Sequence, residues 1–208
     1  MNYPLATNTW DEKEKKAMLE VMESGMYTMG AKVKEFENQF ANFFGSHYAV
    51  MVNSGSSANL VAIASLFYKQ NNPLKQGDEV IVPTVSWSTT YHPLQQYNLQ
   101  LRFVDIDPET LNYNLEALEN AITSRTKMIV AVNLLGNPNN FNEINRIIGE
   151  RNIILIEDNC ESMGAKYEGR YTGTFGVMGT FSTFFSHHIS TMEGGVVLTN
   201  DEELYHIM

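Results

Sequence analysis

Residues 178–195 read Met-Gly-Thr-Phe-Ser-Thr-Phe-Phe-Ser-His-His-Ile-Ser-Thr-Met-Glu-Gly-Gly. Residues 180–185 are rich in aromatic and β-branched side chains, which predicts a buried strand. That run stops just before His187 and His188, and a glycine pair then leads into a second apolar run, 196–198. Two adjacent imidazoles are therefore predicted where a strand enters a loop, which is where open α/β sheets bind ligands. The alternative is a pair of surface histidines in a hairpin.

Upstream of this stretch, predicted strands and helices alternate through most of the chain. The predicted strands cover 48–52, 79–82, 101–104, 127–132 and 153–156. Sustained alternation of this kind argues for an α/β fold with a mostly parallel sheet that is covered on both faces by helices.

Two helices are predicted before the first strand. Thr9 and Glu12 have the spacing of a capping box, so a helix is expected to begin there and to run to Gly25. A second helix is expected to end at Gly45, and its apolar residues are spaced for one buried face. Those residues are Val33, Phe36, Phe40 and Phe43. The two helices are joined by a loop bounded by glycines.

The composition indicates a globular protein rather than a binder of nucleic acid or membranes. The 208 residues are 43% hydrophobic and 18% charged, which suits one α/β domain with a sizeable core. The formal net charge of −10 argues against nucleic acid or an anionic membrane surface as a partner. We identify no signal peptide and no apolar run of the roughly 18–20 residues that span a membrane, so a cytoplasmic location is expected.

A short run of small residues, Gly55-Ser56-Ser57, lies between the first predicted strand and the next helix. Small residues at a helix N-terminus leave backbone N–H groups free for an anion, and the serine hydroxyls add donors. The alternative is an ordinary helix cap. The run matches neither the P-loop pattern nor G-x-G-x-x-G, so ATP and NAD are disfavoured as ligands.

Three other strand ends supply polar or aromatic groups. Trp87 follows a strand that ends in proline, where its ring could stack on a flat ligand, although core packing is the alternative. Asp158 follows Glu157 at the tip of an apolar strand, where a carboxylate could face a protonated ring nitrogen; a solvated turn is the alternative. Ser182 and the adjacent histidines complete the set. An anion cradle, a stacking ring, a carboxylate and an acid/base are what pyridoxal phosphate requires.

With these motifs, the sequence resembles the nucleotide-sugar aminotransferases of fold type I, the aspartate aminotransferase fold. The resemblance covers nearly the whole chain and is carried by residues 33–40, 53–59, 77–83, 103–108, 123–127, 156–158, 164–167 and 193–195. It implies that residues 1–208 form the large cofactor-binding domain, with a mostly parallel mixed sheet sandwiched by helices. Family members continue into a small C-terminal domain. We therefore expect a truncated chain, in keeping with the helical pattern of 201–208, which has no stop signal.

The resemblance also implies a role for each residue of the predicted cofactor site. The matching positions are Gly55, Ser56, Trp87, Asp158, Glu161 and Ser182. In the family, the two N-terminal positions and Ser182 hold the phosphate of pyridoxal 5'-phosphate. Trp87 matches the stacking position, Asp158 matches the partner of the pyridine nitrogen, and Glu161 matches a neighbour of the ring.

The loop between the first two helices matches the substrate-binding segment of the family. Gly25, Met26, Tyr27 and Thr28 are therefore expected to touch the sugar or its nucleotide. A plain helix–helix connection is the alternative. The resemblance further implies a homodimer.

One departure from the family changes the expected chemistry. The family places its Schiff-base lysine five residues after the serine that matches Ser182, and that position is His187. No lysine follows Lys166 in this sequence. Because side chains alternate at the end of a strand, only one of His187 and His188 is expected to face the cofactor, and the spacing favours His187.

This departure resembles the branch of the family in which histidine replaces the lysine, and it implies a lyase. The pyridoxamine 5'-phosphate form, made with L-glutamate as amino donor, would act on a nucleotide-linked 4-keto-6-deoxyhexose such as GDP-4-keto-6-deoxy-D-mannose. His187 would serve as the general acid/base while the C3 hydroxyl is lost. The product would be on the route to a 3,6-dideoxy sugar such as colitose.

Three different functions remain open from the sequence. The first is a CDP-linked sugar 3-dehydratase of the same family, which also has histidine at this position but carries an iron–sulfur cluster. Cys160 is the single cysteine of these 208 residues and cannot supply the four ligands of a cluster, so no metal site is predicted within them. The second is a sugar aminotransferase, and the third is a catalytically incompetent chain that only binds cofactor or sugar.

Overall fold

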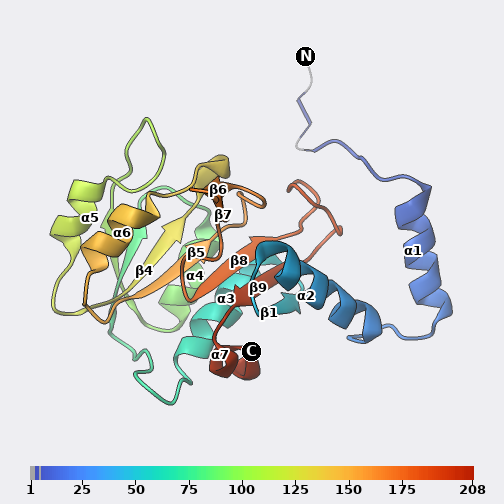
Figure 1. The fold of residues 1–208 in the computed structure, drawn as a ribbon, viewed down its shortest axis with the longest axis horizontal. Coiled ribbons are helices and arrows are strands. Elements are labelled where there is room, and N and C mark those ends of the chain that lie inside the picture. Colours follow the sequence, from blue (N-terminus) through green and yellow to red (C-terminus); the bar gives the residue numbers. More distant parts are fainter. Residues whose placement is uncertain (1–2, 5) are drawn as a thin grey trace.

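The structure is a computed structural model that describes residues 3–4 and 6–208. Met1, Asn2 and Leu5 belong to the predicted domain 1–208 but lie outside the described residues. Within the described part, a seven-stranded sheet forms the centre of the fold, with a separate two-stranded ribbon beside it (Figure 1).

The central sheet is mixed but mostly parallel, as predicted. Its strands are β1 (Tyr48–Val52), β2 (Glu79–Pro83), β3 (Gln100–Val104), β4 (Thr126–Val132), β5 (Ile154–Asp158), β8 (Met178–Ser182) and β9 (Gly195–Thr199). They lie in the order β1-β9-β8-β5-β4-β2-β3. Within this sheet, the described antiparallel pairings are those of β9 with β1 and with β8, and the other pairings are parallel. The ribbon pairs β6 (Lys166–Tyr167) with β7 (Arg170–Tyr171). The strand expected over 180–185 in fact ends at Ser182, because the chain turns there into the loop that carries the histidines.

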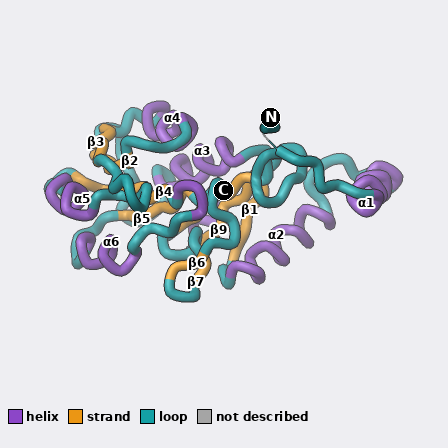
Figure 2. Tube along the Cα trace, turned by 90° about the horizontal axis from the view of Figure 1, so that it is seen from above, coloured by secondary structure: helices purple, strands orange, loops and turns teal. Residues whose placement is uncertain are grey.

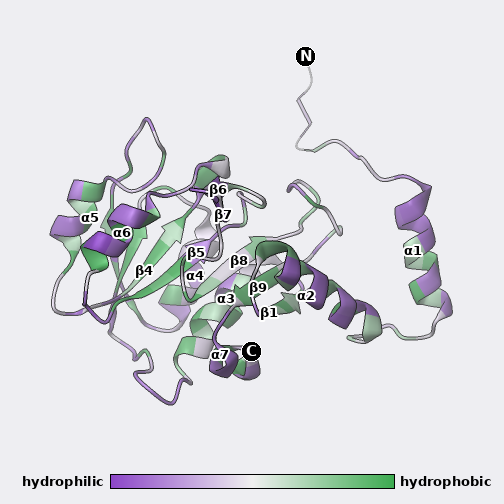
Figure 3. Cartoon of the chain, in the orientation of Figure 1, coloured by the Kyte–Doolittle hydropathy of each residue, from purple (hydrophilic) through white to green (hydrophobic). Residues whose placement is uncertain are grey.

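Helices cover both faces of the sheet, which confirms the predicted layers. They are α1 (Glu12–Glu23), α2 (Ala31–Phe44), α3 (Gly55–Leu66), α4 (Ser88–Gln96), α5 (Leu115–Ala121), α6 (Phe141–Ile148) and α7 (Glu202–Ile207), with a 3₁₀ turn at Leu134–Gly136. Neighbouring strand residues serve opposite layers, since Val80 and Val82 pack with α3 and α4 while Ile81 packs with α5 and α6. A third cluster joins α2 to β1, β8 and β9. Figure 3 shows the hydrophobic strands between these layers.

Two details of the first helices differ from the sequence predictions. The capping box of α1 is made by Asp11 and Glu14, not by Thr9 and Glu12, because the same spacing recurs two residues later with a carboxylate at the cap. In α2 the ring of Phe43 is 60% exposed and Phe44 is buried in its place. The buried face includes Glu37, whose carboxylate accepts the N–H of Met51 at 3.0 Å, so a charged residue helps to set the orientation of the helix.

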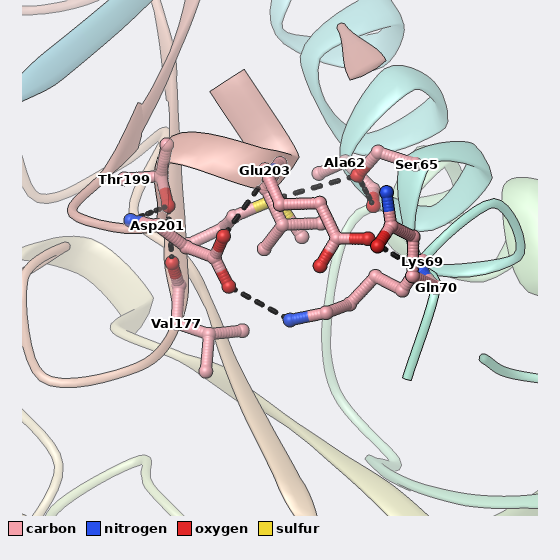
Figure 4. Close-up of polar contacts among 10 residues, drawn as sticks. Ala62, Ser65, Lys69, Gln70, Val177, Thr199, Asp201 and Glu203 are labelled. Atoms are coloured by element: carbon pink, nitrogen blue, oxygen red, sulfur yellow. Dashed lines mark hydrogen bonds and ion pairs between the residues drawn. The ribbon is translucent and has the colours of Figure 1, made fainter. Parts of the chain in front are cut away.

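The two ends of the chain are anchored very differently. Helix α1 extends away from the sheet and has no buried residue (Figures 1 and 2). Helix α7 is tied to the end of α3 by the Lys69 Nζ–Asp201 Oδ2 ion pair of 2.7 Å and by the bond from the N–H of Gln70 to Glu203 (Figure 4). In the part of the chain that is described, no helix combines the length and apolar character needed to cross a membrane.

Candidate active site

The carboxyl ends of several strands meet at one edge of the sheet. Val52 and Ser182 both pair with Gly195, the first residue of β9, and Val132 pairs with Asp158. Because β9 runs antiparallel to its neighbours, its beginning lies beside the ends of β1 and β8. This alignment brings the segments that follow β1, β5 and β8 to one place.

A cavity of about 470 Å³ opens at this edge. Its lining includes all seven residues predicted to bind the cofactor or to act on it: Gly55, Ser56, Trp87, Asp158, Glu161, Ser182 and His187. The structure therefore brings together residues that are spread over more than half of the chain.

The beginning of α3 forms one wall of the cavity and has free backbone donors. Ser54 caps the helix, and its hydroxyl accepts the N–H of Ser57 at 3.1 Å while its carbonyl accepts that of Ala58. The N–H groups of Gly55 and Ser56 lie in the first turn of the helix, where no earlier carbonyl of the helix can accept them. Two amides and the hydroxyls of Ser56 and Ser182 are thus available for a phosphate, and the helix dipole favours a negative charge there.

Glycines allow this wall to approach the sheet closely. A Cβ added to Gly55 would lie 2.6 Å from the Cβ of Ser182 and 2.9 Å from the Sγ of Cys160. A Cβ added to Gly195 would overlap the carbonyl oxygen of Ser54. Gly55 thus contacts the side chains of Ser182 and Cys160, and Gly195 contacts the backbone of Ser54 and Gly55. The position of the anion cradle depends on these two glycines.

We expect Gly195→Ala to destabilise the protein by about 1–3 kcal/mol, because the rigid carbonyl of Ser54 must move to make room. Pyridoxal phosphate binding should weaken as well, since that movement displaces the start of α3. Chemical unfolding and a cofactor titration measure the two effects. Gly30→Ala is the control, because its new Cβ would meet mainly the flexible side chain of Met26. Equal effects of the two substitutions would argue against a cradle fixed by Gly195.

Asp158 is the buried carboxylate of the cavity, and three donors fix its position. Its Oδ2 accepts from Asn59 Nδ2 at 2.9 Å and from Thr90 Oγ1 at 2.7 Å. Its Oδ1 accepts the N–H of Cys160 at 3.2 Å. Asn59 is held in turn by the hydroxyl of Thr180, which donates to its Oδ1 at 2.6 Å. With its side chain 6% exposed, Asp158 can present a negative charge in one orientation.

Glu157, the adjacent acid, lies outside the cavity. Strand neighbours point to opposite faces of a sheet, and this carboxylate is fully buried on the other side. It accepts the N–H groups of Gly173 at 2.6 Å and Gly176 at 2.8 Å, and the amide of Asn133 at 3.1 Å. Glu157 therefore orders the loops behind the site. Of the two adjacent acids, Asp158 lies in the cavity and Glu157 has a structural role.

Trp87 and Glu161 also line the cavity. The indole of Trp87 precedes α4 and is 70% exposed, so its face is available for stacking rather than used in the core. The carboxylate of Glu161 accepts the N–H of Leu135 at 3.1 Å. Leu135 has a φ of 52°, an uncommon conformation for a residue with a side chain, and this turn directs its N–H toward Glu161.

The two histidines occupy a loop rather than the end of a strand, so strand alternation does not distinguish them. The N–H of His187 donates to the carbonyl of Phe184 at 2.9 Å, which closes a turn after β8. His187 is half-buried and lines the cavity, whereas His188 is exposed. Burial lowers the pKa of His187 below its ordinary value, and the charge of Glu161 partly opposes this shift. The imidazole is therefore neutral near pH 7 and able to accept a proton.

The structure adds site residues that the sequence analysis missed, and it leaves one predicted group outside. Asn59 and Thr90 orient Asp158, and Phe184 and Glu193 line the cavity. The available signal for Asn59 and Thr90 was their position. Each is a polar residue in the first turns of a helix that begins at the site. By contrast, residues 25–28 are exposed between α1 and α2 and do not line this cavity.

The charge of the lining is mainly negative. It contains the carboxylates of Asp158, Glu161 and Glu193 and the imidazole of His187, and no lysine or arginine among the described residues. Burial also raises the pKa of the Cys160 thiol well above its usual value, which keeps that side chain uncharged. A phosphate bound here would be held by backbone and hydroxyl donors.

Comparisons with known proteins identify a family and several relatives of this chain. A sequence model of the DegT/DnrJ/EryC1/StrS aminotransferase family matches residues 8–208. GDP-4-keto-6-deoxy-D-mannose 3-dehydratase from Escherichia coli O55:H7 is 64% identical over 208 residues, which are 100% of this chain and 54% of that protein.

Two solved structures are similar over almost the whole chain. They are the E. coli GDP-4-keto-6-deoxy-D-mannose-3-dehydratase with bound hydrated PLP, and GDP-4-keto-6-deoxymannose-3-dehydratase with a trapped PLP–glutamate geminal diamine. Each has a TM-score of 0.97 and 64% identity, and each comparison covers 99% of this chain and 53% of the other. The chain thus spans about half the length of the curated relatives it matches.

Proposed function

Because the chain belongs to the DegT/DnrJ/EryC1/StrS aminotransferase family, we propose that it forms the large cofactor-binding domain of a pyridoxal-phosphate-dependent sugar 3-dehydratase. The proposed substrate is a nucleotide-linked 4-keto-6-deoxyhexose, GDP-4-keto-6-deoxy-D-mannose, and the proposed amino donor is L-glutamate. A relative named for this activity shares 64% of its residues with the chain over the chain's full length. The observation that carries the proposal is the position of a histidine, His187, in a cavity that otherwise suits pyridoxal phosphate.

The cavity fits the cofactor part by part. The amides of Gly55 and Ser56, with the hydroxyl of Ser182, would hold the phosphate. Asp158 would keep the pyridine nitrogen protonated, and the indole of Trp87 would cover the ring face. When bound, the cofactor supplies an electron sink for bond cleavage next to the C4 carbon of the sugar.

His187 moves the proton in the proposed reaction. As a neutral imidazole it accepts a proton from C4′ of the cofactor and then donates one to the C3 hydroxyl, which leaves as water. Asp158 would face the pyridine nitrogen throughout, held in place by Asn59, Thr90 and the N–H of Cys160. Glutamate supplies the amine and the electron pair, so the products are the 3-deoxy-4-keto sugar, ammonia and 2-oxoglutarate. Imidazole forms no stable covalent bond with the cofactor aldehyde, which leaves that form free of the chain.

We further propose a homodimer in which residues 25–28 serve the site of the second copy. Two observations support this: the loop lines no cavity of its own chain near His187, and α1 beside it exposes the apolar side chains of Leu19 (55%) and Met22 (62%). A second copy could also supply the cations that the negative lining lacks. A cytoplasmic location is proposed because nucleotide sugars and glutamate are found there.

The direct test measures ammonia released from GDP-4-keto-6-deoxy-D-mannose in the presence of pyridoxal phosphate. Release should require glutamate and should match the amount of sugar converted. Conversion of the sugar without ammonia, or no conversion by protein that binds the cofactor, would argue against a dehydratase.

We expect the pH dependence of turnover to report the lowered pKa of His187. The imidazole must be deprotonated to accept the proton, so activity should persist down to the ordinary histidine pKa of about 6.5 and fall only below it. A profile of kcat against pH measures this acid limb. Because the charge of Glu161 raises the pKa of His187, Glu161→Gln should move the limb to lower pH. If the acid limb of the Glu161→Gln profile stayed at the same pH, a group other than His187 would control it.

A further inference from the structure

The chain between β4 and α6 makes a turn whose backbone conformation is unfavourable for its sequence. Leu135 has φ 52° and ψ 30°, and Gly136 follows with φ 88°, so two consecutive residues occupy the left-handed region. Glycine adopts this conformation freely, whereas leucine does so rarely and at a cost. The side chain of Leu135 is 70% exposed, so packing in the core does not account for the conformation. Strain of this kind often serves a functional site, which directs attention to the backbone contacts of the turn.

The backbone N–H of Leu135 is the group that the turn presents to the cavity. It donates to Oε2 of Glu161 at 3.1 Å, and Glu161 lines the cavity together with His187. Among the described residues, this is the hydrogen bond that the carboxylate of Glu161 accepts from the protein. The orientation of that carboxylate therefore depends on the conformation of the turn.

Ser162 fastens the turn to the segment that carries Glu161. Its side chain is buried, and its hydroxyl accepts the N–H of Gly136 at 3.0 Å and donates to the carbonyl of Asn133. One hydroxyl thus bridges the two ends of the turn. Asn133 is fully buried, and its N–H donates to the carbonyl of Asp158 at 3.1 Å, which anchors the start of the turn on β5.

We propose that Ser162 and the left-handed turn at Leu135 are positioning elements that hold the carboxylate of Glu161 toward His187. Ser162 does not line the cavity, so it acts through Glu161 and not on a ligand. A carboxylate held near an imidazole favours the protonated form of the ring, so it assists His187 when that ring takes up a proton. The inference rests on the proposed function in one respect, because it takes His187 as the group that moves the proton.

Other ionisable side chains surround His187 without depending on the turn. They are Asp158, Cys160 and Glu193 of the described lining, together with the adjacent His188. In the part of the chain that is described, none of these side chains shares a hydrogen bond with Ser162 or with residues 133–137. A change at Ser162 therefore alters the setting of Glu161 and leaves the other charges in place.

The pKa of His187 reports this arrangement, and NMR titration of the ring needs neither cofactor nor turnover. The chain has five histidines, and His187→Asn identifies the signal that belongs to His187. Because the charge of Glu161 raises the pKa of His187, Glu161→Gln should lower that pKa. Ser162→Ala should cause most of the same fall, since the released carboxylate turns toward solvent. Adding Ser162→Ala to Glu161→Gln should cause no further change.

Gly136→Ala disturbs the same turn without removing the hydroxyl of Ser162. A Cβ added to Gly136 would meet no atom within 4 Å, so the substitution acts only through its φ of 88°, which alanine disfavours. The pKa of His187 should fall again. Gly77→Ala is the matched control, because Gly77 has a φ of 86°, equally open surroundings and a place outside the cavity. Ser65→Ala is the control for Ser162→Ala, because Ser65 is a buried serine whose hydroxyl donates to a carbonyl of its own helix at 2.8 Å (Figure 4).

The proposal requires both turn variants to lower the pKa of His187 and both controls to leave it unchanged. An unchanged pKa in Ser162→Ala and Gly136→Ala would overturn it, and so would equal falls in the controls or no response to Glu161→Gln. If Ser162→Ala failed to fold, Gly136→Ala and its control would decide alone.

The result is separable from the proposed function, because the titration does not depend on catalysis. If His187 responded as predicted in a protein that released no ammonia, the dehydratase would fail while the positioning role stood. If the protein released ammonia while His187 ignored both turn variants, the reverse would hold.

Discussion

Asp158→Asn is expected to lower turnover by at least about 10²–10³-fold, the loss typical for a single electrostatic group that stabilises a transition state. Asparagine has nearly the same shape, so its side-chain oxygen can still accept from Asn59 and Thr90, while the bond from the N–H of Cys160 is lost. Its NH₂ group, however, would face the pyridine nitrogen as a donor and would not keep that nitrogen protonated. Turnover should therefore be lost without loss of the fold, as measured by steady-state kinetics and thermal unfolding.

Asp105→Asn provides the matched control for this substitution. Asp105 also follows a strand at the same edge of the sheet, and it accepts the hydroxyl of Thr84 at 2.9 Å, but it does not line the cavity. We expect near-native turnover from this variant. If Asp158→Asn retained similar activity, Asp158 would be a strand-end residue with a structural role alone.

The second large effect concerns His187. His187→Asn should lower turnover by about 10²–10⁴-fold, the usual contribution of a positioned acid/base. His188→Asn is the control, because the adjacent imidazole is exposed and outside the cavity. Loss of turnover in the His188 variant with retention in the His187 variant would reverse the assignment.

His187→Lys should also change how the cofactor is held. A primary amine at this position can bond covalently to the cofactor aldehyde, which imidazole does not do stably. The variant should become coloured, and borohydride should fix the cofactor to the chain, as intact mass would show. Dehydration should decrease because an amine here directs the proton toward transamination.

Local patterns predicted several of the strand ends that line the cavity. Gly55, Asp158 and Ser182 each lie at or directly after a strand that hydrophobic patterning identifies, and parallel strands place their carboxyl ends at one edge. The resemblance then supplied their roles. The position of His187 was predicted from spacing, although the structural reason given for it, alternation at a strand end, was wrong because the residue lies in a loop.

The missed residues depend on strand order, which local patterns do not contain. Asn59 reaches Asp158 because α3 packs on β9 and β8, and these two strands lie between β1 and β5 in the sheet. A polar residue inside a helix is most often solvated, so its position one turn after the start of α3 is only a weak signal of burial. For the same reason Glu37 was left out of the buried face of α2, although its contact with Met51 helps to set the helix orientation.

The central claim is that histidine at the lysine position makes this site a dehydratase and not an aminotransferase. Mass analysis of the sugar product, formed from GDP-4-keto-6-deoxy-D-mannose with pyridoxal phosphate and glutamate, tests it most directly. We predict a 3-deoxy-4-keto sugar with one oxygen fewer than the substrate, accompanied by free ammonia. A 4-amino sugar that keeps its C3 hydroxyl would contradict the claim and would identify the chain as part of an aminotransferase.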